Sequence, residues 1–240
     1  MRKSKSTFTS LSVLFILCLL SCRSAMAQST LVNVPSTDVV SQKKVYVEFD
    51  FVTNYAWERH GSFQSYVPRA VVGVGRDVEA GVNVAYTHVS GVSQPIELQP
   101  NIKWRFYQSE KRGVAASLGC VLYAPITHRV GADTFGLCYT VFSKKVNSSY
   151  GPRFTGGSYF LIGRDDGTGA KGGAIAGFEQ PLHKRVSFVM DWFSGRNRFG
   201  YVTPGFSFAT TQRSVLYSGY SIGNGGRRNN ALFGFYGVTF

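Results

Sequence analysis

The alternation of apolar and polar residues between residues 96 and 107 constrains the fold of this chain most strongly. In the run IELQPNIKWRFY, every second residue from Ile96 to Phe106 is apolar, and charged or amide side chains stand between them. Because successive side chains on a strand point to opposite faces, one face of this strand is apolar along its length and the other is polar. Strands of this kind, about ten residues long, are typical of membrane-spanning barrels.

The same alternation recurs over most of the chain after residue 43. The predicted strands are 44–54, 65–75, 78–88, 95–107, 114–124, 133–143, 152–163, 171–180, 185–194, 199–209, 214–222 and 231–240. The sequence therefore predicts an all-β fold, a transmembrane antiparallel up-and-down β-barrel of about 12 strands. Backbone groups in hydrocarbon must all be paired, so we expect 44–54 to lie beside 231–240 and close the barrel.

The alternation also predicts which side chains face outward. The outward set on the first strand is Val45, Val47, Phe49 and Phe51, and on 133–143 it is Phe135, Leu137, Tyr139 and Val141. The strand at 95–107 gives the strictest test of this predicted orientation. There Ile102 and Trp104 should face lipid, and Lys103 and Arg105 should face the interior.

Residues 1–27 have the pattern of an export signal. Arg2, Lys3 and Lys5 precede an apolar core at 11–20, and Ala25-Met26-Ala27 is a small-x-small cleavage site. A second reading places a lipoprotein-type cut before Cys22. We expect 1–27 to be a signal peptide, 28–42 a periplasmic N-terminal segment with no domain of its own, and 43–240 the outer-membrane barrel.

The charge of the chain favours a bacterial surface over nucleic acid. Without residues 1–27, 22 basic and 13 acidic residues remain. An exported chain rarely meets nucleic acid, so we predict no nucleic-acid partner. Lipids and lipopolysaccharide of the outer membrane are the expected partners for the positive charge.

Outside the signal the cysteines are Cys120 and Cys138. They are nearly equidistant from the middle of a predicted hairpin near residue 129, so a cross-strand disulfide is one reading. The predicted alternation points Cys120 outward and Cys138 inward, however, which favours two free thiols. Two cysteines make no metal site by themselves, and we expect no metal and no cofactor.

Charged residues with inward alternation are the candidates for lining the lumen. They are Glu48, Asp50, Arg69, Glu79, Glu97, Lys103, Arg105, Arg153, Glu179 and Asp191. One reading is a narrow water-filled path for small solutes, and the other is a salt-bridged plug that holds the lumen shut. Twelve strands lie between barrels filled by side chains and barrels with an aqueous channel, so both readings stay open.

The last strand ends in Tyr236, Val238 and Phe240 on one face. This ending is similar to the terminal strand of bacterial outer-membrane barrels, which the barrel-assembly machinery reads. We therefore predict that Tyr236, Val238 and Phe240 form an assembly signal.

The run RAVVGVGRDVEAGVNVAYTHVSGVSQPIELQPNIKWRFYQSEKRGVAASLGCVLYAP, followed by GFEQPLHKRVSFVMDWFSGRNRFGYVTPGFSF, resembles the transporter family of the phenol-degradation MetA pathway. The features that carry the likeness are a short charged turn, an alternating strand, a polar loop and a strand ending in K-x-R-F. The likeness covers roughly residues 65 to 240. It implies an outer-membrane barrel that passes small solutes, hydrophobic or aromatic compounds among them.

Two other function classes are weighed against a channel. An outer-membrane lipid hydrolase would use His88 and Ser90, but Glu97 and Asn101, the nearest orienting groups, have inward alternation and leave the pair without a third member. A non-conducting structural or surface barrel would need long, adhesive loops, and the loops here are short. We therefore predict a non-enzymatic barrel.

Overall fold

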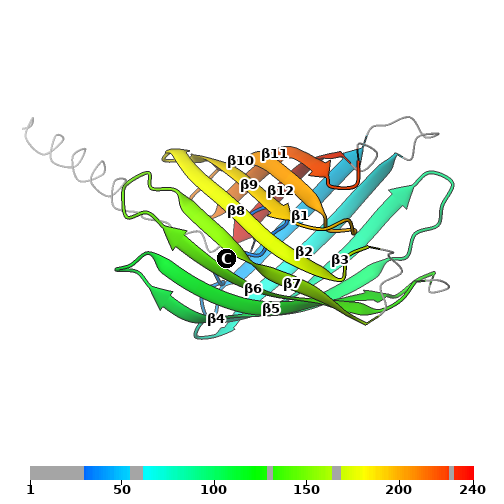
Figure 1. Ribbon diagram of the computed structural model, residues 1–240, viewed down its shortest axis with the longest axis horizontal. Coiled ribbons are helices and arrows are strands. Elements are labelled where there is room, and N and C mark those ends of the chain that lie inside the picture. Colours follow the sequence, from blue (N-terminus) through cyan, green and yellow to red (C-terminus); the bar gives the residue numbers. More distant parts are fainter. Residues whose placement is uncertain (1–29, 55–61, 129–131, 164–168, 227–229) are drawn as a thin grey trace, which may run out of the picture.

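Twelve antiparallel strands form one closed barrel in the computed structural model (Figure 1). The structure describes residues 30–54, 62–128, 132–163, 169–226 and 230–240, so the predicted signal peptide lies outside the described residues. The strands are β1 (Val45–Asn54), β2 (Phe63–Gly75), β3 (Val78–Val89), β4 (Glu97–Ser109), β5 (Val114–Pro125), β6 (Phe135–Lys145), β7 (Arg153–Gly163), β8 (Gly172–His183), β9 (Val186–Phe193), β10 (Tyr201–Ala209), β11 (Ser214–Gly223) and β12 (Ala231–Thr239). The described residues contain no helix long and apolar enough to cross a bilayer.

The first and last strands close the ring. β1 pairs with β12 in an unbroken antiparallel register from Tyr46 opposite Thr239 to Thr53 opposite Leu232. The prediction that 44–54 lies beside 231–240 is confirmed. No strand edge is left open, so each strand finds backbone partners on both sides.

The two ends of the barrel differ in the length of their connections. The connections at one end are 76–77, 110–113, 146–152, 184–185 and 210–213, and those at the other are 55–62, 90–96, 126–134, 164–171, 194–200 and 224–230. We call these the short-turn end and the long-loop end. The chain enters β1 and leaves β12 at the short-turn end.

The outward face is apolar, as the alternation predicts for most strands. Ile102 and Trp104 are 54% and 49% exposed, whereas Lys103 between them is 2% exposed. On β1, Phe49 is exposed and Glu48 is buried in the lumen. Aromatic rings on neighbouring strands touch one another around the outside, as in the contact of Phe188 on β9 with Phe206 on β10.

The prediction for β6 was wrong, because the more apolar face of this strand points into the lumen. Leu137 and Tyr139 are buried in the lumen, and the outward side chains are the alternate ones, ending in Phe142 at 56% exposure. Alternation cannot orient a strand that buries apolar residues on its inner face.

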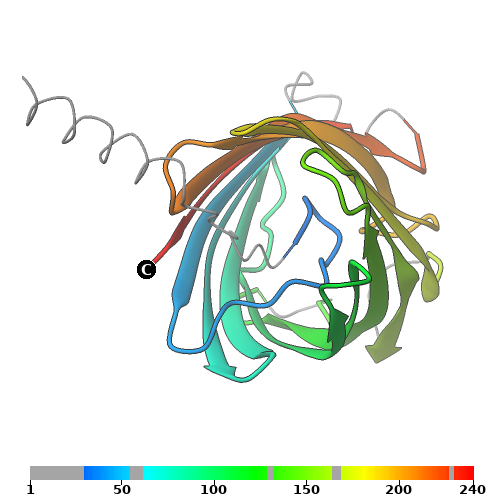
Figure 2. The same cartoon turned by 90° about the vertical axis from the view of Figure 1, so that its left-hand side faces the viewer.

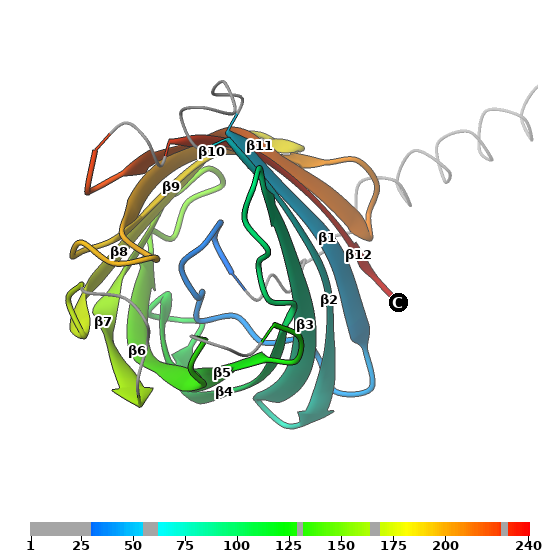
Figure 3. The ribbon, with the colours of Figure 1, turned by 90° about the vertical axis from the view of Figure 1, so that its right-hand side faces the viewer.

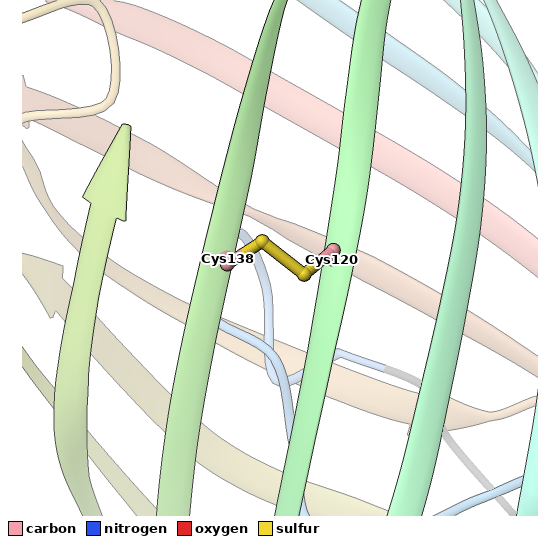
Figure 4. The surroundings of a disulfide bond; sticks show 2 residues. All are labelled: Cys120 and Cys138. Atoms are coloured by element: carbon pink, nitrogen blue, oxygen red, sulfur yellow. A yellow bond between two sulfur atoms is a disulfide. The ribbon is translucent and has the colours of Figure 1, made fainter. Parts of the chain in front are cut away.

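This reversed orientation also explains why the preference for two free cysteines was wrong. Cys138 shares the outward face with Phe142, and in the ladder it lies directly opposite Cys120. The two form a disulfide bond across β5 and β6, with the Cα atoms 4.1 Å apart (Figure 4).

The segment before β1 lies inside the barrel. Figures 2 and 3 show it in blue, folded into the lumen. Val34 is 0% exposed and Val40 is 1% exposed. The sequence analysis expected 28–42 to be a periplasmic segment with no domain of its own, and its described part, residues 30–42, runs through the lumen toward β1.

Candidate functional site

The lumen is the candidate site, and a hairpin in residues 30–35 is its first component. Thr30 bridges Pro35, and the backbone N–H of Leu31 donates to the carbonyl oxygen of Val34 at 2.8 Å. The turn between them presents three successive backbone N–H groups to one acceptor. Oδ2 of Asp191, on β9, accepts hydrogen bonds from the N–H groups of residues 32, 33 and 34 at 3.0, 2.7 and 2.8 Å.

This arrangement is a nest of backbone amides around a buried carboxylate. Asp191 is 1% exposed, so its charge is stabilised by these donors rather than by water. The side-chain amide of Asn33 adds a hydrogen bond to Thr203 Oγ1 at 3.0 Å. The tip of the hairpin is thus fixed to β9 and β10.

Apolar packing holds the same hairpin on both sides. Leu31 and Val34 pack into a cluster of buried residues from β6 to β9, which includes Tyr139 and Tyr159. Val32 packs into a second cluster, formed by residues of β9, β11 and β12. The hairpin therefore replaces water between opposite walls of the barrel.

Residues 36–42 descend from the hairpin toward the short-turn end. The Val40 N–H donates to Glu79 Oε2 at 2.6 Å, and the Ser117 hydroxyl donates to the carbonyl oxygen of Thr37 at 2.9 Å. The hydroxyls of Thr37 and Ser143 lie 2.6 Å apart. These contacts reach β3, β5 and β6, so the segment is bound to several walls of the lumen. We call residues 30–42 the plug.

Asp38 forms the ionic contact of the plug. Its carboxylate pairs with Arg153 on β7, which also binds Glu179 on β8, with Nε of Arg153 2.9 Å from Oε2. Burial alone would raise the pKa of Asp38, but the positive charge of Arg153 and its hydrogen bond hold the pKa below the ordinary value of 3.8. The contact is therefore ionic at neutral pH.

The inward-facing charges predicted from the sequence pair with one another inside the barrel. Arg69 Nη1 lies 2.7 Å from Glu48 and 3.6 Å from Asp50, across β1 and β2. Lys103 Nζ lies 2.9 Å from Glu79, and both side chains are almost fully buried.

The remaining predicted charges are also partnered. Arg105 binds Asp77 in the turn after β2, with Nε 2.9 Å from Oδ1. Glu97 binds Arg198, which the sequence analysis did not select. The ten predicted residues thus lie on the lumen side, most of them in pairs, and Glu79, Arg153 and Asp191 contact the plug.

A cavity of about 480 Å³ lies between the plug and the long-loop end. The plug contributes Val32, Asn33 and Pro35 to its wall, and the loop before β10 contributes Arg198 and Phe199. Amide side chains line it on β3 and β4, and aromatic rings line it on β5, β6, β9 and β12. The amides are Asn83, Gln99 and Asn101, and the rings are Tyr123, Tyr139, Phe193 and Phe235. The volume is typical of a small-molecule site.

Arg198 crosses the mouth of this cavity. β4 and β10 lie diametrically opposite each other in the ring of twelve, and Arg198 stands in the loop just before β10. Both terminal nitrogens of its guanidinium bind the carboxylate of Glu97, at the start of β4, at 2.8 Å each. The guanidinium carbon also lies 5.2 Å from the ring centre of Tyr123 and 5.4 Å from that of Phe135.

The sequence analysis predicted neither the plug nor the bridge between Arg198 and Glu97. The plug lacks strict alternation, yet five of its residues are aliphatic, namely Leu31, Val32, Val34, Val39 and Val40. That density of aliphatic residues was a usable signal for burial. Nothing in the sequence placed Arg198 opposite Glu97, because the pairing depends on the circumference of the barrel.

The structure gives no support to the other chemistries that were weighed. His88 is exposed on the outward side at the end of β3, Ser90 lies in the turn after it, and no hydrogen bond joins their side chains in the described part of the chain. Glu97 faces the lumen and binds Arg198. Among the described residues, no group of three or more His, Cys, Asp or Glu side chains could hold a metal ion.

Comparison with solved structures identifies the fold. The chain is similar to an outer-membrane channel from Pseudomonas putida F1, with a TM-score of 0.53 and 13% identity over 84% of this chain and 97% of that one. Weaker matches include the KdgM porin in complex with disordered oligogalacturonate (TM-score 0.48, 9% identity, 82% of this chain and 98% of that one) and the translocator domain of the autotransporter NalP from Neisseria meningitidis (TM-score 0.45, 13% identity, 98% and 97%). No family model matches the chain, and no curated protein matches it.

Proposed function

We propose that this protein is an outer-membrane channel for small solutes that is held closed by the plug at residues 30–42. The observation that carries the proposal is the combination of an apolar outer face with a polar lumen that retains a cavity of about 480 Å³. A barrel that served only as a scaffold would have no need of a cavity lined by amides. The plug closes this cavity toward the short-turn end, and the Arg198–Glu97 bridge closes it toward the long-loop end.

Three observations support the membrane location. The outward face is a continuous apolar and aromatic surface, the predicted signal at residues 1–27 would export the chain, and the fold is shared with an outer-membrane channel. Outer-membrane barrels have short periplasmic turns and longer extracellular loops. The short-turn end then faces the periplasm, and the plug enters from that side.

The lining of the cavity points to small amphipathic solutes, aromatic compounds among them. The amides of Asn83, Gln99 and Asn101 offer hydrogen-bond donors and acceptors on one wall. Tyr123 and Phe235 offer ring faces on the others. This class agrees with the resemblance of residues 65–240 to transporters of the phenol-degradation MetA pathway.

Assembly and surface contacts complete the proposal. Tyr236 on the outward face of β12 is 46% exposed and Phe240, directly after the strand, is 63% exposed; together with Val238 they form the proposed signal for the barrel-assembly machinery. The barrel would then lie among outer-membrane lipids and lipopolysaccharide.

A non-conducting barrel is the second candidate, and the density of hydrogen bonds between plug and wall favours it. Single-channel recording in planar bilayers separates the two. We would compare the unaltered chain with a variant that lacks residues 30–38, after checking by heat-modifiability that each barrel is folded. Discrete conductance steps in the shortened variant, rare or absent in the full chain, support the channel. If neither folded protein conducts, the channel proposal is refuted and the non-conducting barrel remains.

Solute class is tested by flux into liposomes. The shortened variant should pass a small hydroxylated aromatic compound faster than a sugar of similar mass. Equal rates for both solutes would refute the proposed preference without refuting the channel.

A further inference from the structure

The outer face of the barrel has a groove near the short-turn end, over β4 to β7. Its volume is about 670 Å³, within the range of small-molecule sites. Phe106, Phe142 and Phe154 line it, and Ala116 and Gly156 lie among them with little or no side chain. A Cβ added to Gly156 would meet no atom within 4 Å, so the groove is open there.

The groove meets a basic cluster at the rim of the barrel. Lys144 is the one charged residue among the described residues that line the groove, and it lies between Val114 and Phe154 in the ladder. Its Nζ donates a hydrogen bond to the carbonyl oxygen of Arg112, which ties Lys144 to the turn between β4 and β5.

The neighbouring turns supply further positive charge. Asn147 donates to the carbonyl oxygen of Lys111 at 2.9 Å, and the Lys145 N–H donates to that of Gly113 at 2.7 Å, so the two turns are held side by side. The exposed bases of this cluster are Lys111, Arg112, Lys144 and Lys145, against the single exposed acid Glu110 in the same two turns.

We propose that this groove and its basic rim, Lys111, Arg112 and Lys144, form a binding site for one anionic phospholipid. An acyl chain lies along the phenylalanines over Ala116 and Gly156, and the phosphate of the headgroup lies against the lysines and the arginine. Two kinds of complementarity support this site. The aliphatic chain packs in an apolar groove that lies in the membrane, and the anionic phosphate binds the basic residues where the groove ends. The site rests on the proposed membrane location but not on conduction.

The test uses Trp104, whose ring centre is 5.9 Å from that of Phe106 at the edge of the groove. The full chain with Trp57→Phe and Trp192→Phe keeps Trp104 as its sole tryptophan, and it is reconstituted in bilayers of brominated phosphatidylcholine, which quenches tryptophan fluorescence. Unbrominated phosphatidylglycerol or phosphatidylcholine is then added as competitor. We expect phosphatidylglycerol to relieve the quenching at a much lower mole fraction.

A charge variant and a matched control test whether the basic rim binds the phospholipid headgroup. Each Lys or Arg near an anionic surface is worth about a fivefold factor in association. Replacing Lys111, Arg112 and Lys144 by Gln should therefore lower the preference for phosphatidylglycerol by up to about a hundredfold at low salt. The control, Lys184→Gln with Arg185→Gln and Arg213→Gln, removes the same charge from other turns of the same end and should leave the preference in place.

The groove itself is tested by Gly156→Phe, which fills it on a lipid-facing strand position where an aromatic residue is well tolerated. This variant keeps all basic residues and should still lose the preference. Equal competition by the two lipids in the unaltered groove, or equal loss in the charge variant and its control, would overturn the site. Selective binding of phosphatidylglycerol without conductance would overturn the channel proposal and leave the lipid site standing. Conductance without a preference between the two lipids would overturn the lipid site and leave the channel proposal standing.

Discussion

Removing the carboxylate of Asp191 should release the tip of the plug. Oδ2 of Asp191 accepts three backbone hydrogen bonds from residues 32–34, and no other element anchors these N–H groups in the described structure. A hydrogen bond to a charged group contributes about 1.5–3 kcal/mol, but three donors on one oxygen are not additive. We estimate about 3–5 kcal/mol for the set, since that is the usual cost of removing one partner of a buried charged contact. The equilibrium for opening the tip in Asp191→Ala should then rise by roughly a hundredfold to several thousandfold.

The opening can be measured by cysteine protection at position 34. Val34 is 0% exposed, and a Val34→Cys side chain would react with a methanethiosulfonate reagent only when the hairpin leaves its site. Cys120→Ala and Cys138→Ala remove the native cysteines, whose disulfide lies on the outward face away from the plug. The reaction rate is proportional to the fraction of time that the tip is open, provided that closing is faster than modification.

Two control variants distinguish the loss of the hydrogen bonds to Asp191 from a general destabilisation of the plug. Asp191→Asn keeps an acceptor oxygen without the charge and should give an intermediate rate. Asn33→Ala removes the hydrogen bond from the Asn33 side chain to Thr203 and should raise the rate only about threefold to tenfold, the value of one ordinary hydrogen bond. A rate in Asp191→Ala equal to that of the parent, in a barrel that still shows heat-modifiability, would refute the anchoring role.

Three further predictions concern the mouth, the ionic contact of the plug and the closure of the barrel. Arg198→Gln should lengthen single-channel open times by about twofold to tenfold, because the partly exposed bridge to Glu97 is worth only about 0.5–1.5 kcal/mol; unchanged open times would exclude a gate at the mouth. Because the pKa of Asp38 is lower in the folded chain than its ordinary 3.8, its contact with Arg153 contributes stability above about pH 3.8 and loses it as the pH falls through the folded pKa. The part of plug protection that depends on Asp38 should therefore be lost only below about pH 4, and Asp38→Asn should remove that acid step; an unchanged acid step in Asp38→Asn would contradict the assignment. Deleting 231–240 leaves β1 without its partner and should abolish membrane insertion, so recovery of a folded, heat-modifiable protein would refute closure by this pair.

The outward surface could be predicted from the sequence wherever the two faces of a strand differ in polarity. On β4, Ile102 and Trp104 lie outward and Lys103 inward, as their alternation requires, because lipid excludes charge on one side and the lumen accepts it on the other. The number of strands and the pairing of the first with the last follow from the same rule, since a strand in hydrocarbon cannot leave its backbone groups unpaired.

The same rule could not orient β6. Its inner face carries Leu137 and Tyr139, which pack against the plug, so the more apolar face of this strand points inward and the alternation gives the wrong sign. The disulfide was missed for the same reason, because the direction of Cys138 was inferred from that strand. The inner apolar residues of β6 can be understood only once the plug is seen beside them.

The sequence by itself determined where the strands lie, which side of most of them meets lipid, and that the barrel must close, because these depend on the order of residues along one strand. The tertiary structure alone decided what fills the barrel. Asp191 meets residues 32–34 from a distance of more than 150 positions in the chain, and Glu97 meets Arg198 across the full width of the ring. Such contacts depend on the diameter of the closed barrel and on the path of the plug within it, and no local pattern of residues encodes either.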